Sequence, residues 1–220
     1  DLLKSVRDEA NNLTTITYDK YGRKTAMSDP DMGSWSYVYD VFGNLTAQTD
    51  ARTCVTTVTY DDLNRPTGKT YSGPGACNPT PDVTYTYDSV TGGNEGWGRR
   101  TGMSNSNSST SWTYNALGQA TNETQTLEST NYSITTDFDA FGRPLSQTIP
   151  GQGGTENLYY TYNAMGALSS LANASSSYVS QIHYEASGQV ANQQLGNGLV
   201  QQFCYDADTL RLTKLRVYSG

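Results

Sequence analysis

The chain of 220 residues has little of what most active sites are built from. It has one histidine and three cysteines, with no CxxC pair and no Cys/His cluster, which excludes a zinc site. Its formal net charge is -7 and it has no block of Lys or Arg, whereas phosphate binding needs a basic footprint. We therefore expect no nucleic-acid partner, no metal and no cofactor.

Long apolar runs are also missing. Hydrophobic residues make up 35% of the chain, and no run approaches the roughly 18 residues of a membrane span. Phe occurs 4 times and Trp 3 times, whereas Tyr occurs 17 times and Gly 21 times. Low apolar content is typical of disordered chains. Tyr and Thr nevertheless fit a pleated, half-buried sheet surface, so the composition favours an ordered β protein without a membrane span.

One phrase recurs along the whole chain. It consists of an aromatic anchor, an acidic or amide residue directly after it and, in most copies, a glycine four residues after the anchor. A clear copy is Tyr39-Asp-Val-Phe-Gly-Asn44. The spacing of 21 to 27 residues between anchors is typical of repeat proteins, so we interpret residues 1–220 as a single array of about nine repeats. The anchors are Tyr18, Tyr39, Tyr60, Tyr87, Tyr114, Phe138, Tyr162, Tyr184 and Tyr205.

Each repeat is predicted to be a β-hairpin followed by a connecting turn. Residues before the anchor alternate, as in Trp35-Ser-Tyr-Val-Tyr39, which indicates a strand with one aromatic face. The acidic or amide residue can accept backbone N–H bonds, and the glycine allows a positive φ. A second strand then leaves the turn, as at residues 44–49. These turn residues are Asp19, Gly22, Asp40, Gly43, Asp61, Asp88, Gly118, Asp139, Gly142, Gly166, Gly188 and Asp206.

A single hairpin is marginally stable in water, so the repeats must stack and cover one another. A sheet of this many strands has to twist. The anchor rings are expected to come into register as a ladder of aromatic contacts. The predicted fold class is therefore all-β, an extended and twisted antiparallel sheet.

The Tyr-Asp-x-x-Gly-Arg/Asn phrase resembles the Rhs/YD-repeat family, and the resemblance covers positions 13 to 217. That family includes bacterial Rhs proteins, the BC components of insecticidal Tc toxins and the teneurin ectodomain. The resemblance implies a sheet strip wound as a spiral into a hollow β-shell, which encloses a toxic domain in toxins and is an adhesion scaffold in teneurins. It implies a structural scaffold, secreted or at the cell surface, and not an enzyme.

The resemblance also bears on partners and on chain organisation. The resemblance implies neighbouring repeats or an enclosed toxin domain as partners, whereas the unpaired strand edges of an array without capping repeats predict self-association through those edges. The shell-plugging segment with a self-cleavage site that usually ends toxin-type members has no counterpart here, and the chain stops inside the repeat pattern. We therefore expect a segment of a much longer chain, belonging to a closed shell or to an open fibre.

Four features of the sequence allow other interpretations. Aromatic sheet faces can bind glycans, so the alternative function is a cell-surface adhesion or carbohydrate-binding module. Aspartates follow six anchors, but catalysis needs one asymmetric constellation, so turn formation is favoured. His183 has no marked partner and is expected to be a strand residue. The segment 92–98 lacks the Lys-Ser/Thr and the helix of a phosphate loop, so we expect a long turn with Trp97 as a candidate contact residue.

The cysteines predict one disulfide. Cys54 and Cys77 lie 23 residues apart, close to one repeat period, so adjacent repeats bring their loops together. Such a bond requires an oxidising compartment. Cys204 directly precedes an anchor and therefore points to the opposite sheet face from that ring. We expect Cys204 to remain free.

Overall fold

The computed structural model describes residues 2–77, 80–151 and 153–220, and in them nearly all regular structure is strand. Its only helical elements there are two three-residue 3-10 turns, η1 (Gly75–Cys77) and η2 (Thr91–Gly93). The all-β prediction is confirmed. The strands are β1 (Ser5–Arg7), β2 (Leu13–Tyr18), β3 (Lys24–Asp29), β4 (Gly33–Tyr39), β5 (Leu45–Thr49), β6 (Val55–Tyr60), β7 (Pro66–Ser72), β8 (Val83–Tyr87), β9 (Arg100–Ser104), β10 (Ser108–Tyr114), β11 (Ala120–Leu127), β12 (Thr130–Phe138), β13 (Pro144–Gly151), β14 (Gly154–Tyr162), β15 (Leu168–Ala172), β16 (Ser177–Tyr184), β17 (Val190–Leu195), β18 (Leu199–Tyr205) and β19 (Leu212–Ser219).

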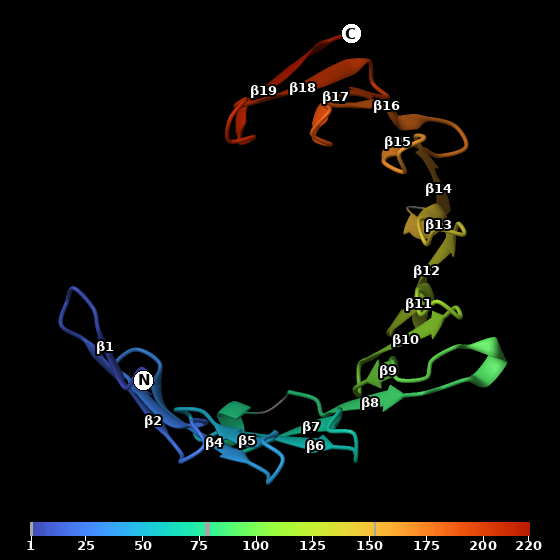
Figure 1. Ribbon diagram of the computed structural model, residues 1–220. Coiled ribbons are helices and arrows are strands. Elements are labelled where there is room, and N and C mark those ends of the chain that lie inside the picture. Colours follow the sequence, from blue (N-terminus) through green and yellow to red (C-terminus); the bar gives the residue numbers. More distant parts are fainter. Residues whose placement is uncertain (1, 78–79, 152) are drawn as a thin grey trace. The chain divides into compact units, whose positions relative to one another are not determined.

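The chain divides into two compact units. The first is Asp1–Ser111 with Thr126–Ser129, and the second is Trp112–Gln125 with Thr130–Gly220. Within each unit, strands that follow one another in the chain pair antiparallel, as β2 does with β3 and β13 with β14 (Figure 1). Each repeat thus supplies a hairpin, as the spacing of the anchors predicts.

The two faces of the strands differ in exposure. In β4 the side chains of Trp35, Tyr37 and Tyr39 are half-buried, whereas Ser34 and Ser36 are exposed. The aromatic face expected from the alternation is therefore the more covered one. Among the described residues only Cys77 and Val200 are buried hydrophobic residues, each with 8% of its surface exposed. Because the described residues enclose no hydrophobic core, contacts between successive repeats must contribute much of the stability.

A β-bulge lies beside the anchors. Tyr18 is paired with Lys24 and Thr17 with Ala26, so Thr25 is an extra residue. Bulges bend a strand and increase its local twist. These bulges were not predicted. The same irregularity occurs at Val38/Tyr39, Thr59/Tyr60, Thr86/Tyr87, Asp137/Phe138, Thr161/Tyr162, His183/Tyr184 and Cys204/Tyr205.

The extra residue of the bulge is often Thr or Ser. Seven residues after Tyr60, the hydroxyl of Thr67 lies 3.0 Å from that of Thr59, the residue directly before the anchor. Matching pairs are Thr17 with Thr25, Thr113 with Thr121 and Thr161 with Ser169. These hydroxyl pairs join the two strands of a hairpin at the point where the ladder is interrupted.

Candidate functional site

The residue after the anchor organises the turn. The backbone N–H of Asp61 donates to the carbonyl of Arg65 (3.0 Å), and that of Asn64 donates to the carbonyl of Asp61 (2.9 Å). One carboxylate oxygen of Asp61 accepts the N–H groups of Leu63 and Arg65, both at 2.9 Å. Asp19, Asp40, Asp139, Asn115 and Asn163 accept the equivalent bonds. In these turns the residue after the anchor therefore accepts the backbone N–H groups of the loop.

The glycine four residues after the anchor has a left-handed backbone. Gly22, Gly43, Gly118, Gly142, Gly166 and Gly188 have φ between 79° and 94°. A Cβ at Gly43 would meet nothing within 4 Å, so backbone conformation and not space requires the glycine. A three-residue hairpin loop that ends in a left-handed residue is a common arrangement. Where glycine is missing, Asn64 (60°), four residues after Tyr60, and Leu210 (55°), five residues after Tyr205, take the same conformation.

The long turn after Tyr87 contains additional residues but keeps the hydrogen bonds of the shorter turns. The N–H of Asp88 donates to the carbonyl of Arg99 (3.1 Å), and the N–H of Gly98 donates to the Asp88 carboxylate (2.7 Å). Gly98 has a φ of 72°. The element that follows is strand β9 and not a helix, so the segment is a turn and not a phosphate loop. Trp97 is 66% exposed there, and its role as a contact residue remains a prediction.

The anchor hydroxyl binds the repeat before it. The hydroxyl of Tyr60 donates to the carbonyl of Leu45 at 2.9 Å. For six anchors the acceptor lies six residues after the preceding anchor, beside the bulge. Because a bulge disrupts the ladder, a carbonyl there needs another donor, and the tyrosine supplies it. The other pairs are Tyr39 with Lys24, Tyr87 with Pro66, Tyr162 with Pro144, Tyr184 with Leu168 and Tyr205 with Val190, at 2.7 to 3.0 Å.

In six repeats the residue five after the anchor reaches forward to the next repeat. The guanidinium of Arg65 donates to the carboxylate of Asp61 in its own turn (2.7 Å). It also donates to both carboxylate oxygens of Asp88 in the next turn, at 3.0 and 2.6 Å. Its Cζ lies 4.4 Å from the centre of the Tyr87 ring, within cation–π range. One side chain therefore joins two repeats.

Other repeats also contact the next repeat through this position, either by an arginine over the anchor ring or by an amide side chain. Arg23 and Arg143 lie 4.9 and 4.2 Å from the rings of the next anchors, Tyr39 and Tyr162. In these cases a guanidinium faces the anchor ring, a contact that the expected aromatic ladder did not include. Amide side chains replace arginine in the pairs Asn44 with Asn64, Gln119 with Gly142 and Gln189 with Leu210, each at 2.7 Å.

We call this set of contacts the clasp: the anchor tyrosine, the residue five after the preceding anchor and the carbonyl six after it. The pKa shifts of the residues in the clasp favour stable hydrogen bonds at neutral pH. The side chain of Arg65 lowers the pKa of Asp88, and the backbone N–H of Arg65 lowers the pKa of Asp61. Burial raises the pKa values of Tyr60 and Tyr87. At neutral pH the carboxylates are therefore charged acceptors and the phenols remain protonated donors.

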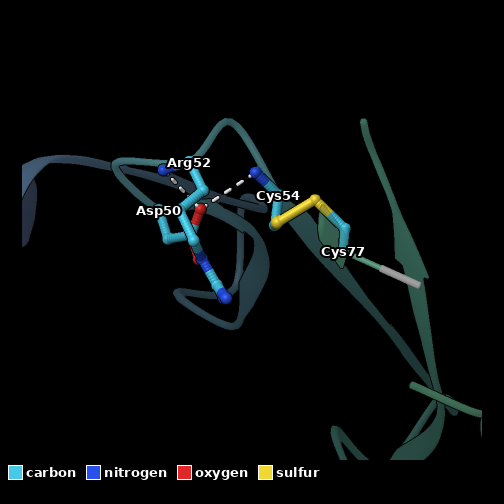
Figure 2. Close-up of a disulfide and its surroundings, with 4 residues drawn as sticks. All are labelled: Asp50, Arg52, Cys54 and Cys77. Carbon is cyan, nitrogen blue, oxygen red and sulfur yellow. Dashed lines mark hydrogen bonds and ion pairs between the residues drawn. A yellow bond between two sulfur atoms is a disulfide. The ribbon is translucent and has the colours of Figure 1, made fainter. Parts of the chain in front are cut away.

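The disulfide predicted between Cys54 and Cys77 is present, with Cα atoms 5.4 Å apart (Figure 2). The chain before it forms the anchor-type turn again. Asp50 accepts the N–H groups of Arg52 and Cys54, both at 2.9 Å, and the side chain of Arg52 pairs with its carboxylate at 2.7 Å. This further Asp turn, at the other end of the hairpin, was not predicted. Cys204 is free.

The remaining candidates form no reactive cluster. His183 is an exposed residue of β16, opposite Asn192 in β17. Over the described stretches, no three His, Cys, Asp or Glu side chains gather as possible metal ligands. Within those same stretches, no helix has the length and apolar character to cross a membrane.

These features define a tandem β-hairpin repeat protein, and the comparisons with known proteins agree. A family model described as RHS Repeat matches residues 39–75. The crystal structure of TcdB2-TccC3-Cdc42 has a TM-score of 0.80 at 15% identity and covers 97% of this chain and 12% of that chain. The structure of the Photorhabdus luminescens Tc holotoxin pore with the mutation TccC3-D651A has a TM-score of 0.79 at 15% identity, covering 98% and 12%. No curated sequence matches the chain.

The family match over residues 39–75 agrees with the resemblance of the Tyr-Asp phrase to the Rhs/YD-repeat family. The chain spans about 12% of the length of these solved chains. At this identity the likeness establishes the fold: a continuous run of antiparallel hairpins.

Proposed function

We propose that the chain is a structural scaffold, a segment of the wall of an Rhs-type β-shell, and that it catalyses no reaction. The observation that carries this proposal is the use of its polar side chains. The tyrosines, aspartates and arginines that mark the repeats bond to one another and to the backbone of a neighbouring repeat. The groups that could do chemistry thus serve to hold hairpins together, at Tyr60 as at Tyr162.

A wall of this kind needs many repeats. The solved structures that share the fold are of Tc toxin components, and this chain spans about 12% of their length. We infer that it acts as part of a longer strip that encloses a cargo, as toxin-type members do. The disulfide supports a location outside the cytoplasm, because such bonds persist in oxidising compartments.

Electron cryo-microscopy of the complete gene product from its own source tests the proposal. We expect a hollow shell in which residues 2–220 form one stretch of a single-layered wall, with internal density for a cargo. A filament, or a solid rod with no enclosed space, would contradict it.

The alternative, an adhesion or carbohydrate-binding module, remains a separate prediction. A glycan array probed with the 220-residue protein decides it. Selective binding at micromolar concentration supports the module, and the absence of binding supports the wall alone.

A further inference from the structure

The hairpin turn between β17 and β18 contains a pair of residues that occurs once in the sequence. Asn197 is followed directly by Gly198, whereas every other asparagine is followed by a residue with a side chain. Glycine has no Cβ to hinder the approach of its backbone nitrogen to the side chain before it. Both residues are exposed, so water reaches them. At this turn a side-chain amide can therefore react with its own backbone.

The side chain of Asn197 is folded forward over the peptide bond that such a reaction uses. Its Oδ1 accepts the backbone N–H of Leu199, two residues on, at 3.1 Å. Because this bond spans Gly198, it brings the side-chain carbonyl carbon of Asn197 towards the backbone nitrogen of Gly198. It also draws electron density from the carbonyl group, which makes that carbon more open to attack.

One hydrogen bond opposes the reaction. The backbone N–H of Gly198 donates to the carbonyl of Leu195 at 3.0 Å, and this bond must open before the nitrogen can attack. The bond closes a turn at the surface, and exposed turns open locally at a small cost in free energy. The folded turn therefore slows the reaction without preventing it.

Asn115 and Asn163 provide a comparison within the same chain. Each accepts the backbone N–H two residues on, at 3.0 Å, as Asn197 does. Each is followed by alanine, and each also accepts the N–H four residues on. The Cβ of the alanine hinders attack and the second bond restrains the side chain, so these two amides should be far less reactive.

We propose that Asn197 is a site of spontaneous modification, at which the amide is converted into aspartate and isoaspartate. The backbone nitrogen of Gly198 loses its proton to hydroxide and forms a bond with Cγ of Asn197. The side-chain nitrogen takes a proton from water and leaves as ammonia. Water then opens the cyclic imide: opening at the side-chain carbonyl gives aspartate, and opening at the backbone carbonyl gives isoaspartate, whose main chain is one methylene longer.

The turn has no room for a longer main chain. A Cβ at Gly196 would collide with the carbonyl oxygen of Ser177. The N–H of Gly196 donates to the carbonyl of Tyr178, and the carbonyl of Gly198 accepts the N–H of Gly220, both at 3.0 Å. Isoaspartate in this turn therefore strains bonds on both sides of the hairpin. The inference goes beyond the proposed wall function, to which it adds an ageing step that loosens one hairpin with time.

Peptide mapping by mass spectrometry, on the 220-residue protein aged at neutral pH, tests the modification. The peptide that contains Asn197 should gain the mass difference between an amide and an acid, and should separate into two chromatographic forms. We expect this to occur at least tenfold faster than in the peptides that contain Asn115 and Asn163. Enzymatic methylation of the isoaspartyl carboxylate identifies the longer form. If Asn197 persists for as long as Asn163 does, the proposal is overturned.

Amide hydrogen exchange tests the structural consequence. Aged protein should exchange faster than fresh protein at residues 177–178 and 195–199, and equally at residues 139–143. Fresh Asn197→Asp is the matched control, because it has the new charge on a main chain of normal length, and it should exchange as fresh wild type does. Aged protein that exchanges like fresh protein, or Asn197→Asp that exchanges as fast as aged protein, would overturn the loosening by a longer main chain. Neither result bears on the wall function, which the image of the complete gene product judges separately.

Discussion

The hydroxyl of Tyr60 donates a hydrogen bond to the carbonyl oxygen of Leu45, fifteen residues earlier and one repeat back. This bond explains why the anchor is tyrosine in eight of its nine copies, because phenylalanine has no donor. It also links the two signals of the repeat, the anchor and the bulge. The tyrosine of one hairpin completes the interrupted ladder of the hairpin before it.

Replacing Tyr60 by Phe should lower the free energy of unfolding by about 1 kcal/mol, because the half-buried carbonyl of Leu45 loses its donor. Urea denaturation followed by circular dichroism measures it. Tyr21→Phe is the matched control, since Tyr21 is 71% exposed in a turn, and it should unfold as the wild type does. Equal stabilities for all three proteins would refute the role of the hydroxyl.

Replacing Gly43 by Val should cost about 1–3 kcal/mol, because a β-branched residue is strained at a φ of +94°. No neighbouring atom would clash with the new Cβ, so the effect isolates backbone strain. Gly75→Val is the control, because that glycine has open space and no positive φ. Thermal denaturation should separate the two variants, and equal melting would mean that the turn does not need a left-handed residue.

The contacts of the clasp should weaken at acidic pH. Hydrogen bonds from Arg65 lower the pKa values of Asp61 and Asp88 in the folded protein. A carboxylate with a lowered folded pKa contributes stability that is present above its unfolded pKa of about 3.9 and is lost as the pH falls through the folded pKa. The melting temperature should therefore fall steeply below about pH 4.

The variant Asp61→Asn/Asp88→Asn tests this assignment. In their own repeats, Asn115 and Asn163 accept the equivalent hydrogen bonds from backbone N–H groups, so the turns should still form with asparagine. The variant should melt lower than the wild type at pH 7 and show a shallower decline towards pH 2. An unchanged acid profile would show that other groups control it.

Opening the disulfide should lower the free energy of unfolding by about 3 kcal/mol, the loop-closure value for a separation of 23 residues. Cys54→Ser/Cys77→Ser measured against wild type gives the value, and Cys204→Ser is the neutral control. Peptide mapping without reductant should recover a linked Cys54–Cys77 peptide. Three alkylatable thiols in oxidised protein would rule the bond out.

Much of the fold follows from local sequence. Strand alternation before Tyr39, the Asp40 cap and the left-handed Gly43 are all set within a few residues, so a period of about 21 residues is enough to predict hairpins. The disulfide between Cys54 and Cys77 could be predicted for the same reason, since a separation of about one period places two residues in adjacent repeats.

The clasp was not predicted, because it depends on the register between repeats. Nothing local to Tyr87 shows that its hydroxyl reaches Pro66 or that its ring faces Arg65. One signal in the sequence could have shown the bulge: hydroxyl residues recur one before and seven after the anchor, as at Thr59 and Thr67. The Arg or amide five after most anchors is a second such signal.

Amide hydrogen exchange followed by mass spectrometry tests most directly whether the clasp couples each repeat to the next. Replacing Arg65 by Ala should speed exchange in its own turn, 61–65, and equally in the next one, 88–99, because Arg65 binds carboxylates in both. The turn at 139–143 keeps Arg143 and should be unchanged. Arg52→Ala, which removes a pair within a single turn, should affect residues 50–54 alone. Faster exchange confined to residues 61–65 in the Arg65 variant would contradict the coupling of repeats.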